Sequence, residues 1–138
     1  MSISRVARSI ADALVDPKTV KQLALSSAVG RPRQDIQCSN LLCDKIGKPC
    51  ICRLSSVLGR TTTLKSLLLA GNGLDDLPDS LWGLQELEVL DLQDNQLTNL
   101  SSRISELRSL RVLKIRGNPE LKIAMQNIAS MRFVRVVT

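Results

Sequence analysis

Leucines recur along the middle of the chain in a pattern that repeats every 23 residues. The first unit reads LKSLLLAGNGLDDLPDSLWGLQE from Leu64, and the second reads LEVLDLQDNQLTNLSSRISELRS from Leu87. A third unit begins LRVLKIRGNPEL at Leu110. A self-match at a fixed offset is typical of repeat architectures, in which each unit packs on its neighbours. The middle of the chain is therefore expected to form a stack of repeats.

Each unit predicts a strand followed by a helical turn. Leu67 and Leu69 alternate along LxxLxL and would point to one side of a short strand, so that stacked units form a parallel sheet. An Asn after each strand would satisfy backbone groups of the turn inside the stack; these are Asn72, Asn95 and Asn118. The second half of a unit spaces its apolar residues by three and four, which favours helical turns. Those residues are Leu77, Leu81, Leu84, Leu100, Ile104 and Leu107.

The pattern LxxLxLxxNxL, from Leu64 to about Leu121, resembles the leucine-rich repeat family. The stretch NGLDDLPDSLWGLQEL is similar to the 23-residue subtype with an LP dipeptide, found in intracellular Ras-suppressor-like and plant Ras-group-related proteins. The expected fold is of the α/β class. It is a short leucine-rich repeat solenoid, with parallel strands on a concave face and helical turns on a convex face.

The repeat register extends beyond residues 64–121 in both directions. Toward the N-terminus, residues 38–63 are predicted as a degenerate cap repeat that contains the cysteines, although Asp44 replaces a core Leu and Pro49 stands in place of Asn. Its framework residues would be Leu41, Ile46, Ile51, Leu54 and Leu58. Toward the C-terminus, residues 122–138 are predicted as a cap helix followed by a strand in RFVRVV. In that strand Val136 would match Leu113.

Residues 1–37 lie outside the repeat and are predicted as a basic, helical N-terminal extension. Apolar residues from Ile3 to Leu14 follow helical spacing, and Pro17 would begin a second helix that continues to about Gly30. Such an extension would cap the core of the first repeat, or would be an arm that becomes ordered on a partner.

Residues on the solvent side of the predicted strands form a candidate protein-binding surface, because solenoids commonly bind partners on their concave face. We refer to these nine residues as the concave face. They are Ser66, Val89 and Val112; Leu68, Asp91 and Lys114; and Ala70, Gln93 and Arg116. Asp91 and Lys114 should be neighbours across adjacent strands. A solvated surface without a partner is the alternative.

Charge is divided unevenly along the chain, whose net charge is +6. Residues 1–63, 64–103 and 104–138 carry +6, −5 and +5. The two basic ends could contact RNA phosphates. The candidates are Arg5, Arg8, Arg31, Arg33, Lys45, Lys48, Arg132 and Arg135. Because Trp82 and Phe133 are the only aromatic residues, contact would be with the RNA backbone rather than with stacked bases. A solvated basic surface is the alternative.

All four cysteines lie within 15 residues, with the spacing C-x4-C-x6-C-x-C. Cys38, Cys43, Cys50 and Cys52 could hold a zinc ion through four thiolates, although a CxC pair is atypical. The repeat register would place Cys43 on a strand and Cys50 and Cys52 in the following loop, too distant for four thiolates to meet. Small reduced residues without a metal are therefore favoured. Extracellular leucine-rich repeat proteins imply a disulfide-bonded cap as a further alternative.

The chain has no His, which removes the commonest general base. We therefore predict a protein that is not an enzyme, with no cofactor and no small-molecule substrate. No stretch approaches the roughly 18 apolar residues of a membrane span. Because a secretory signal is also lacking, an intracellular location is expected. The acid-free start MSISRVARSIA suggests mitochondria, with the cytoplasm as the alternative.

These observations favour a non-catalytic scaffold that is a structural subunit of a larger assembly, with other protein subunits as partners. A ribonucleoprotein such as an organellar ribosome would use the two basic blocks. An accessory subunit of a mitochondrial membrane complex would use the extensions without RNA. The resemblance to Ras-suppressor-like proteins implies a competing class, a cytosolic signalling adaptor that binds a GTPase or a phosphatase.

Overall fold

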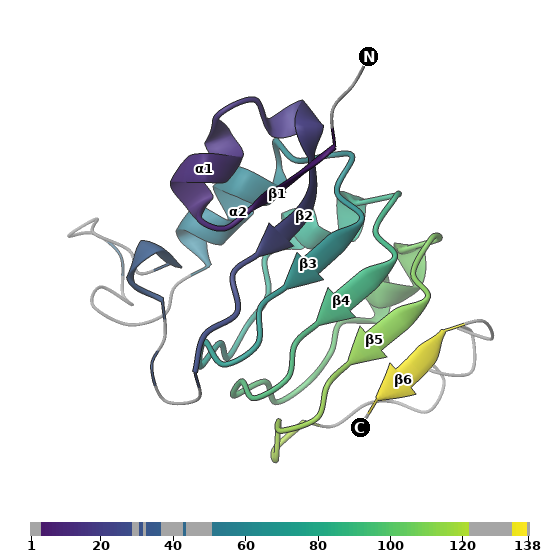
Figure 1. The fold of residues 1–138 in the computed structure, drawn as a ribbon. Helices are drawn as coiled ribbons and strands as arrows, with labels where there is room; N and C mark the ends of the chain where they lie inside the picture. Colours follow the sequence, from purple (N-terminus) through teal and green to yellow (C-terminus); the bar gives the residue numbers. More distant parts are fainter. Residues whose placement is uncertain are drawn as a thin grey trace.

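Six short strands form one parallel sheet whose spatial order follows the sequence, β1-β2-β3-β4-β5-β6 (Figure 1). The structure is a computed structural model, and it describes residues 4–28, 31, 33–36, 43, 51–121 and 134–137. The strands are β1 (Arg5–Ala7), β2 (Val20–Ala24), β3 (Ser66–Leu68), β4 (Val89–Asp91), β5 (Val112–Lys114) and β6 (Arg135–Val137).

Helical segments connect the strands. They are α1 (Ile10–Leu14), η1 (Pro17–Thr19), η2 (Gln34–Ile36), α2 (Cys52–Leu58), η3 (Asp79–Gly83) and η4 (Ser102–Glu106), where η denotes a 3-10 helix. In the view of Figure 1, α2, η3 and η4 lie behind the sheet. A parallel sheet with short helical segments behind it is the α/β solenoid that the repeat predicts.

The register of the sheet confirms the 23-residue repeat. Ser66 pairs with Val89 and Val89 with Val112, so equivalent residues of successive units face one another. The leucines of the repeat are buried between the sheet and the helical segments. Those of the strand half are Leu64, Leu67, Leu69, Leu87, Leu90, Leu92, Leu110 and Leu113. The solenoid therefore has one continuous aliphatic core.

The N-terminal residues correct the prediction of a helical extension. Only Ile10–Leu14 of the first predicted helix is helical, and the strand β1 precedes it. The second predicted helix begins at Pro17 as predicted, but only Pro17–Thr19 (η1) is helical, and the strand β2 follows it. In β2, Leu23 pairs with Leu67 of β3. The residues Val20-x-x-Leu23-x-Leu25 repeat the LxxLxL pattern, but they precede the matching residues of the first unit by 44 positions rather than 23. Their spacing fits a helix equally well, and pairing with β3 decides in favour of the strand.

The predicted cap repeat at residues 38–63 is also corrected. Because β3 is flanked by β2 and β4, no strand that begins near Leu41 lies beside it. Leu41 and Ile46 lie outside the described residues. Leu54 and Leu58 are buried as predicted, and they belong to α2, which contacts η3.

The C-terminal strand is confirmed in the predicted register. Val136 of β6 pairs with Leu113 of β5. The predicted cap helix before it lies outside the described residues. Over the part of the chain that the structure describes, no helix is long and apolar enough to cross a membrane.

Candidate protein-interaction surface

The strands bring all nine predicted residues of the concave face together in aligned rows that run across the sheet. Ser66, Val89 and Val112 form one row, and Leu68, Asp91 and Lys114 form the next. The ladder of hydrogen bonds continues past the strands, because Gly71 N–H donates to Gln93 O (3.0 Å) and Asp94 N–H donates to Arg116 O (2.9 Å). The third row, Ala70, Gln93 and Arg116, is therefore aligned as well.

Buried asparagines fix the spacing between neighbouring units. Asn95 Nδ2 donates to the carbonyl oxygens of Leu69, Leu92 and Gln93 at 3.0 to 3.1 Å. Its Oδ1 accepts the backbone N–H groups of Asn72 (3.1 Å) and Leu74 (3.0 Å). The amide satisfies buried backbone groups of the turn, as predicted, and it also ties two repeats together. The concave face is consequently built on a hydrogen-bonded frame rather than on independent loops.

The centre of the concave face is apolar and accessible. Leu68, Val89 and Val112 are each half-buried on three adjacent strands. The strand β2 extends this surface, since Gln22 pairs with Ser66 and Ala24 with Leu68. Sequence reasoning missed Gln22 and Ala24, although the LxxLxL pattern around Leu23 would have indicated them.

Asp91 and Lys114 are neighbours in the register, as predicted. Asp91 is only 9% exposed, and its Oδ1 accepts hydrogen bonds from the backbone N–H and the side-chain amide of Gln93, both at 3.1 Å. The ion pairs between described residues do not include one between Asp91 and Lys114. Gln93 therefore holds the Asp91 carboxylate in place.

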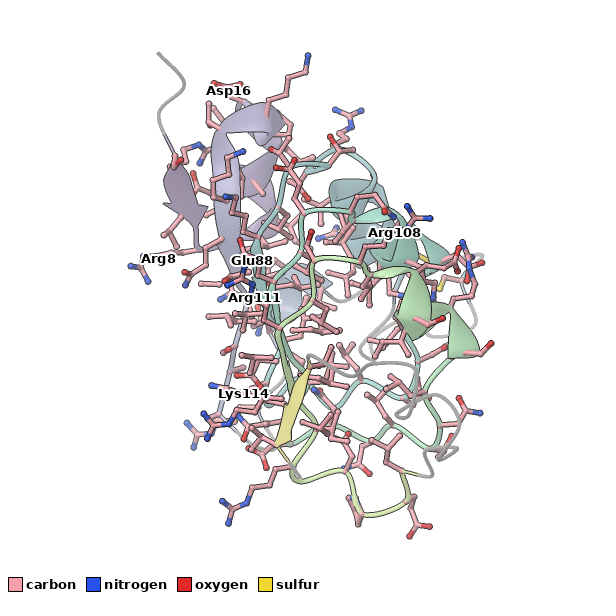
Figure 2. The ribbon with its side chains drawn as sticks, turned by 90° about the vertical axis from the view of Figure 1, so that its right-hand side faces the viewer. Arg8, Asp16, Glu88, Arg108, Arg111 and Lys114 are labelled. Atoms are coloured by element: carbon pink, nitrogen blue, oxygen red, sulfur yellow. The ribbon has the colours of Figure 1, made fainter. Side chains whose placement is uncertain are left out.

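A charged rim borders the concave face where the strands begin. Glu88 lies between two cations, with its carboxylate 3.9 Å from Lys65 Nζ and 3.8 Å from Arg111 Nε. These three residues line a hollow of about 410 Å³. Glu88 and Arg111 lie side by side in Figure 2, with Lys114 farther along the same side of the molecule, and Arg108 also lines the hollow.

Arg5, one of the predicted phosphate ligands, bonds within the fold. Its Nη1 contacts Asp12 Oδ1 at 3.0 Å, and its Nε donates to Thr19 Oγ1 at 2.9 Å. The guanidinium also donates to the carbonyl oxygens of Asp12, Val15 and Asp16. Arg5 therefore closes the C-terminal end of α1, where orphan carbonyls need donors.

Arg33 has a similar internal role. Its guanidinium contacts the two Asp35 oxygens at 2.9 and 3.1 Å and donates to the Arg8 carbonyl at 2.8 Å. Asp35 Oδ2 also accepts the Ile10 N–H at 3.0 Å. Partial burial raises the pKa of Asp35, but the hydrogen bonds from Arg33 and Ile10 outweigh burial and hold the pKa below its usual value. The pair joins η2 to the start of α1.

The remaining predicted phosphate ligands do not form one patch among the described residues. Arg8, Arg31 and Arg135 are exposed, but Arg8 follows β1 and Arg135 lies on β6, at opposite edges of the sheet. Lys45, Lys48 and Arg132 lie outside the described residues. RNA contact stays a prediction.

Two of the four cysteines lie close together. Cys43 Sγ and Cys52 Sγ are 3.9 Å apart, and Cys52 is the first residue of α2 rather than part of a loop. The placement of Cys52 in a loop is corrected, and the expectation that the four thiolates are too distant to meet stays a prediction. Cys38 and Cys50 lie outside the described residues. Within the described ranges, no group of three or more His, Cys, Asp or Glu residues could hold a metal ion, so the zinc site stays a prediction.

Comparisons with known proteins agree with this geometry. The family model described as "Leucine rich repeat" matches residues 62–119. A solved structure of a leucine-rich repeat protein from Leptospira interrogans has a similar fold, with a TM-score of 0.62 and 22% sequence identity. The match covers 99% of this chain and 35% of that chain, so this chain spans about a third of its length. No curated protein sequence matches significantly. The described fold is thus that of a leucine-rich repeat solenoid, and residues 62–119 are similar to the leucine-rich repeat family.

Proposed function

We propose that the chain is a non-catalytic scaffold that binds a protein partner on its concave face and serves as a structural subunit of a larger assembly. The observation that carries this proposal is the apolar patch of three half-buried side chains, Leu68, Val89 and Val112, from two adjacent rows on the open side of the sheet. Apolar side chains that remain accessible on a rigid surface are typical of a contact site.

The surroundings of that patch support contact with a protein. Residues of both charges border the apolar centre. Glu88 and Asp91 lie directly before and on β4, and Arg111 and Lys114 lie directly before and on the next strand, β5. An apolar core with a polar rim is the usual anatomy of a protein interface. Backbone bonds and buried asparagines hold the side chains in register, which lowers the entropy that binding costs.

The sequence leaves three kinds of partner open: RNA, the other subunits of a mitochondrial complex, and a GTPase or a phosphatase. We place binding on the concave face because Arg5 and Arg33, two of the candidate RNA ligands, donate their hydrogen bonds within the fold. A subunit of a mitochondrial complex and a cytosolic adaptor for a GTPase or a phosphatase would use the same concave face. The identity of the proteins that co-purify with the native chain separates these two versions.

A paired set of variants tests the proposal. The double variant Leu68→Asp, Val89→Asp places two charges in the apolar patch. The control, Thr98→Asp with Ser105→Asp, places two charges at exposed sites off the concave face. Each tagged chain is expressed in its source cells, and its mass is followed by gradient sedimentation. We expect the wild type and the second pair to migrate in a large complex, and the first pair to migrate as a free chain.

Incorporation of the Leu68→Asp, Val89→Asp chain at the wild-type level would refute the proposal. Circular dichroism of each purified variant checks that it is folded. If the double variant unfolds, Val112→Lys gives a second test, because this half-buried residue lies in the same patch.

A further inference from the structure

The concave face is unevenly charged from one end of the sheet to the other. The strands β2 and β3 carry one cation each in or directly before the strand, Lys21 and Lys65, beside the neutral side chains of Gln22, Ala24, Ser66 and Leu68. The columns of β5 and β6 carry cations without an acid. These cations are Arg111, Lys114, Arg116 and Arg135. The acids nearest these cations are Glu88, Asp91 and Asp94, which lie on or beside β4, and the Asp94 carboxylate lies against Gly117, next to Arg116.

The carboxylates of β4 leave most of this positive charge uncompensated. Glu88 lies between Lys65 and Arg111, and Gln93 holds the Asp91 carboxylate. Among the described residues, no ion pair involves Lys114, Arg116 or Arg135. These residues are half-exposed or exposed.

Residues 121–138 contain no Asp or Glu. Glu120 is the last acidic residue of the chain, and Lys122 and Arg132 follow it. The β5–β6 end of the concave face thus has a positive potential. A potential of one sign beside an apolar patch selects partners of the opposite sign.

We infer that the concave face binds an acidic protein segment, with apolar side chains of that segment against Leu68, Val89 and Val112 and its carboxylates facing Lys114, Arg116 and Arg135. The inference rests on the proposed function and specifies the partner. Guanidinium groups donate paired hydrogen bonds to a carboxylate, which favours Asp and Glu in the bound segment. Because no aromatic residue stands in these columns, bases of a nucleic acid would find no stacking surface.

Selection from a phage-displayed library of random linear peptides tests this inference on the full chain. We expect the selected peptides to combine apolar residues with Asp and Glu, and their binding to weaken as NaCl is raised. Selected peptides are then synthesised with a fluorescent label, and their affinities for the variants are measured by anisotropy.

Charge reversal provides the sharpest comparison. Lys114→Glu with Arg116→Glu should weaken binding of the selected peptides by about tenfold or more, since charge pairs across an interface contribute on this scale. Lys18→Glu with Arg60→Glu makes the same change in charge at exposed sites off the concave face and should change affinity less than about twofold. Circular dichroism verifies that both double variants are folded.

The outcomes separate this inference from the proposed function. Peptides without acidic enrichment whose binding is lost in Leu68→Asp would overturn the inference and leave the concave face as the binding site. Peptides that bind Leu68→Asp as well as wild type would contradict the proposed site. A labelled single-stranded uridine homopolymer serves as the RNA probe. If it binds the Lys114 and Arg116 side more tightly than the acidic peptides do, the surface is a nucleic-acid site and the inference is wrong.

Discussion

Asn72, Asn95 and Asn118 show how single residues couple the repeats. Each is buried after a strand. The Oδ1 atom of one Asn accepts backbone N–H groups from the preceding unit, as Asn118 does from Leu97 at 3.2 Å. The Nδ2 atom donates to carbonyl oxygens of its own unit and of the preceding one, as Asn118 does to Ile115 and Leu92 at 2.9 Å. Loss of one such side chain leaves several buried backbone groups unsatisfied on both sides.

Replacing Asn95 with Ala should therefore destabilise the whole solenoid. Asn95→Ala is expected to lower the free energy of unfolding by about 2–3 kcal/mol, because the freed N–H and C=O groups stay buried. Urea denaturation followed by circular dichroism measures the change. Asn99→Ala, at an exposed position four residues away, is the control and should cost less than about 0.5 kcal/mol. Equal stability of the two variants would show that Asn95 does not couple the repeats.

The role of these asparagines could be predicted from the sequence, because it recurs in register with the leucines. The roles of Arg5 and Arg33 could not. An arginine that closes a helix end and one that faces solvent look alike in a sequence, and only the approach of Asp12, Thr19 and Asp35 distinguishes them. Both arginines were consequently predicted as phosphate ligands.

At the scale of elements, the Arg33–Asp35 pair fastens η2 to α1 and should give stability a dependence on pH. The folded-state pKa of Asp35 lies below its unfolded value of 3.8. Its contribution is therefore fully present above the unfolded pKa and is lost as pH falls through the folded-state pKa. Asp35→Asn should cost about 1–2 kcal/mol at neutral pH, and this difference from wild type should shrink in acid below the unfolded pKa.

Urea denaturation of both chains from neutral to acidic pH measures that difference. Asp79→Asn is the control, since Asp79 is exposed and its contact with Arg103 is long, at 3.9 Å. A constant difference between wild type and Asp35→Asn over the whole pH range would show that the Asp35 carboxylate contributes nothing through its charge.

The sequence predicted neither β1 nor β2 as a strand, and β2 shows the reason. The three apolar residues Val20, Leu23 and Leu25 of this segment are spaced by three and two, which fits either a helix or a strand. The decisive information lies in β3, 44 residues away along the chain. The repeat itself was predictable because its units are adjacent in sequence and equal in length.

Gly71, just after β3, packs closely against the backbone of Ser27, just after β2. This contact tests where the β2 segment lies. Gly71 has φ +78°, and a Cβ there would lie 1.9 Å from the Ser27 carbonyl oxygen. Gly71→Ala should therefore cost at least about 2 kcal/mol. Gly83→Ala is the control, because a Cβ at Gly83 meets nothing within 4 Å, and it should change stability by less than about 0.5 kcal/mol. Thermal unfolding of both variants decides, and a neutral Gly71→Ala would contradict this arrangement of β2 and β3.

At the scale of the whole molecule, the sheet from β1 to β6 presents one surface whose character changes along its length. Packing fixes the core leucines and asparagines of each repeat. The apolar patch and the cations of β5 and β6 occupy the positions that packing does not fix. The sequence therefore predicted which residues share the concave face. It did not predict that β2 enlarges the surface or that Gln93 holds the Asp91 carboxylate.

The most direct test of the concave face as the binding surface is lysine footprinting of the chain in its native assembly and in isolation. Acetylation by an amine-reactive ester, read by mass spectrometry, should reach Lys18, Lys65 and Lys114 in the isolated chain, where they are exposed or half-exposed. In the assembly, Lys65 and Lys114 should be protected, while Lys18, on η1, reacts as before. Unchanged labelling of Lys65 and Lys114 in the assembly would contradict the account.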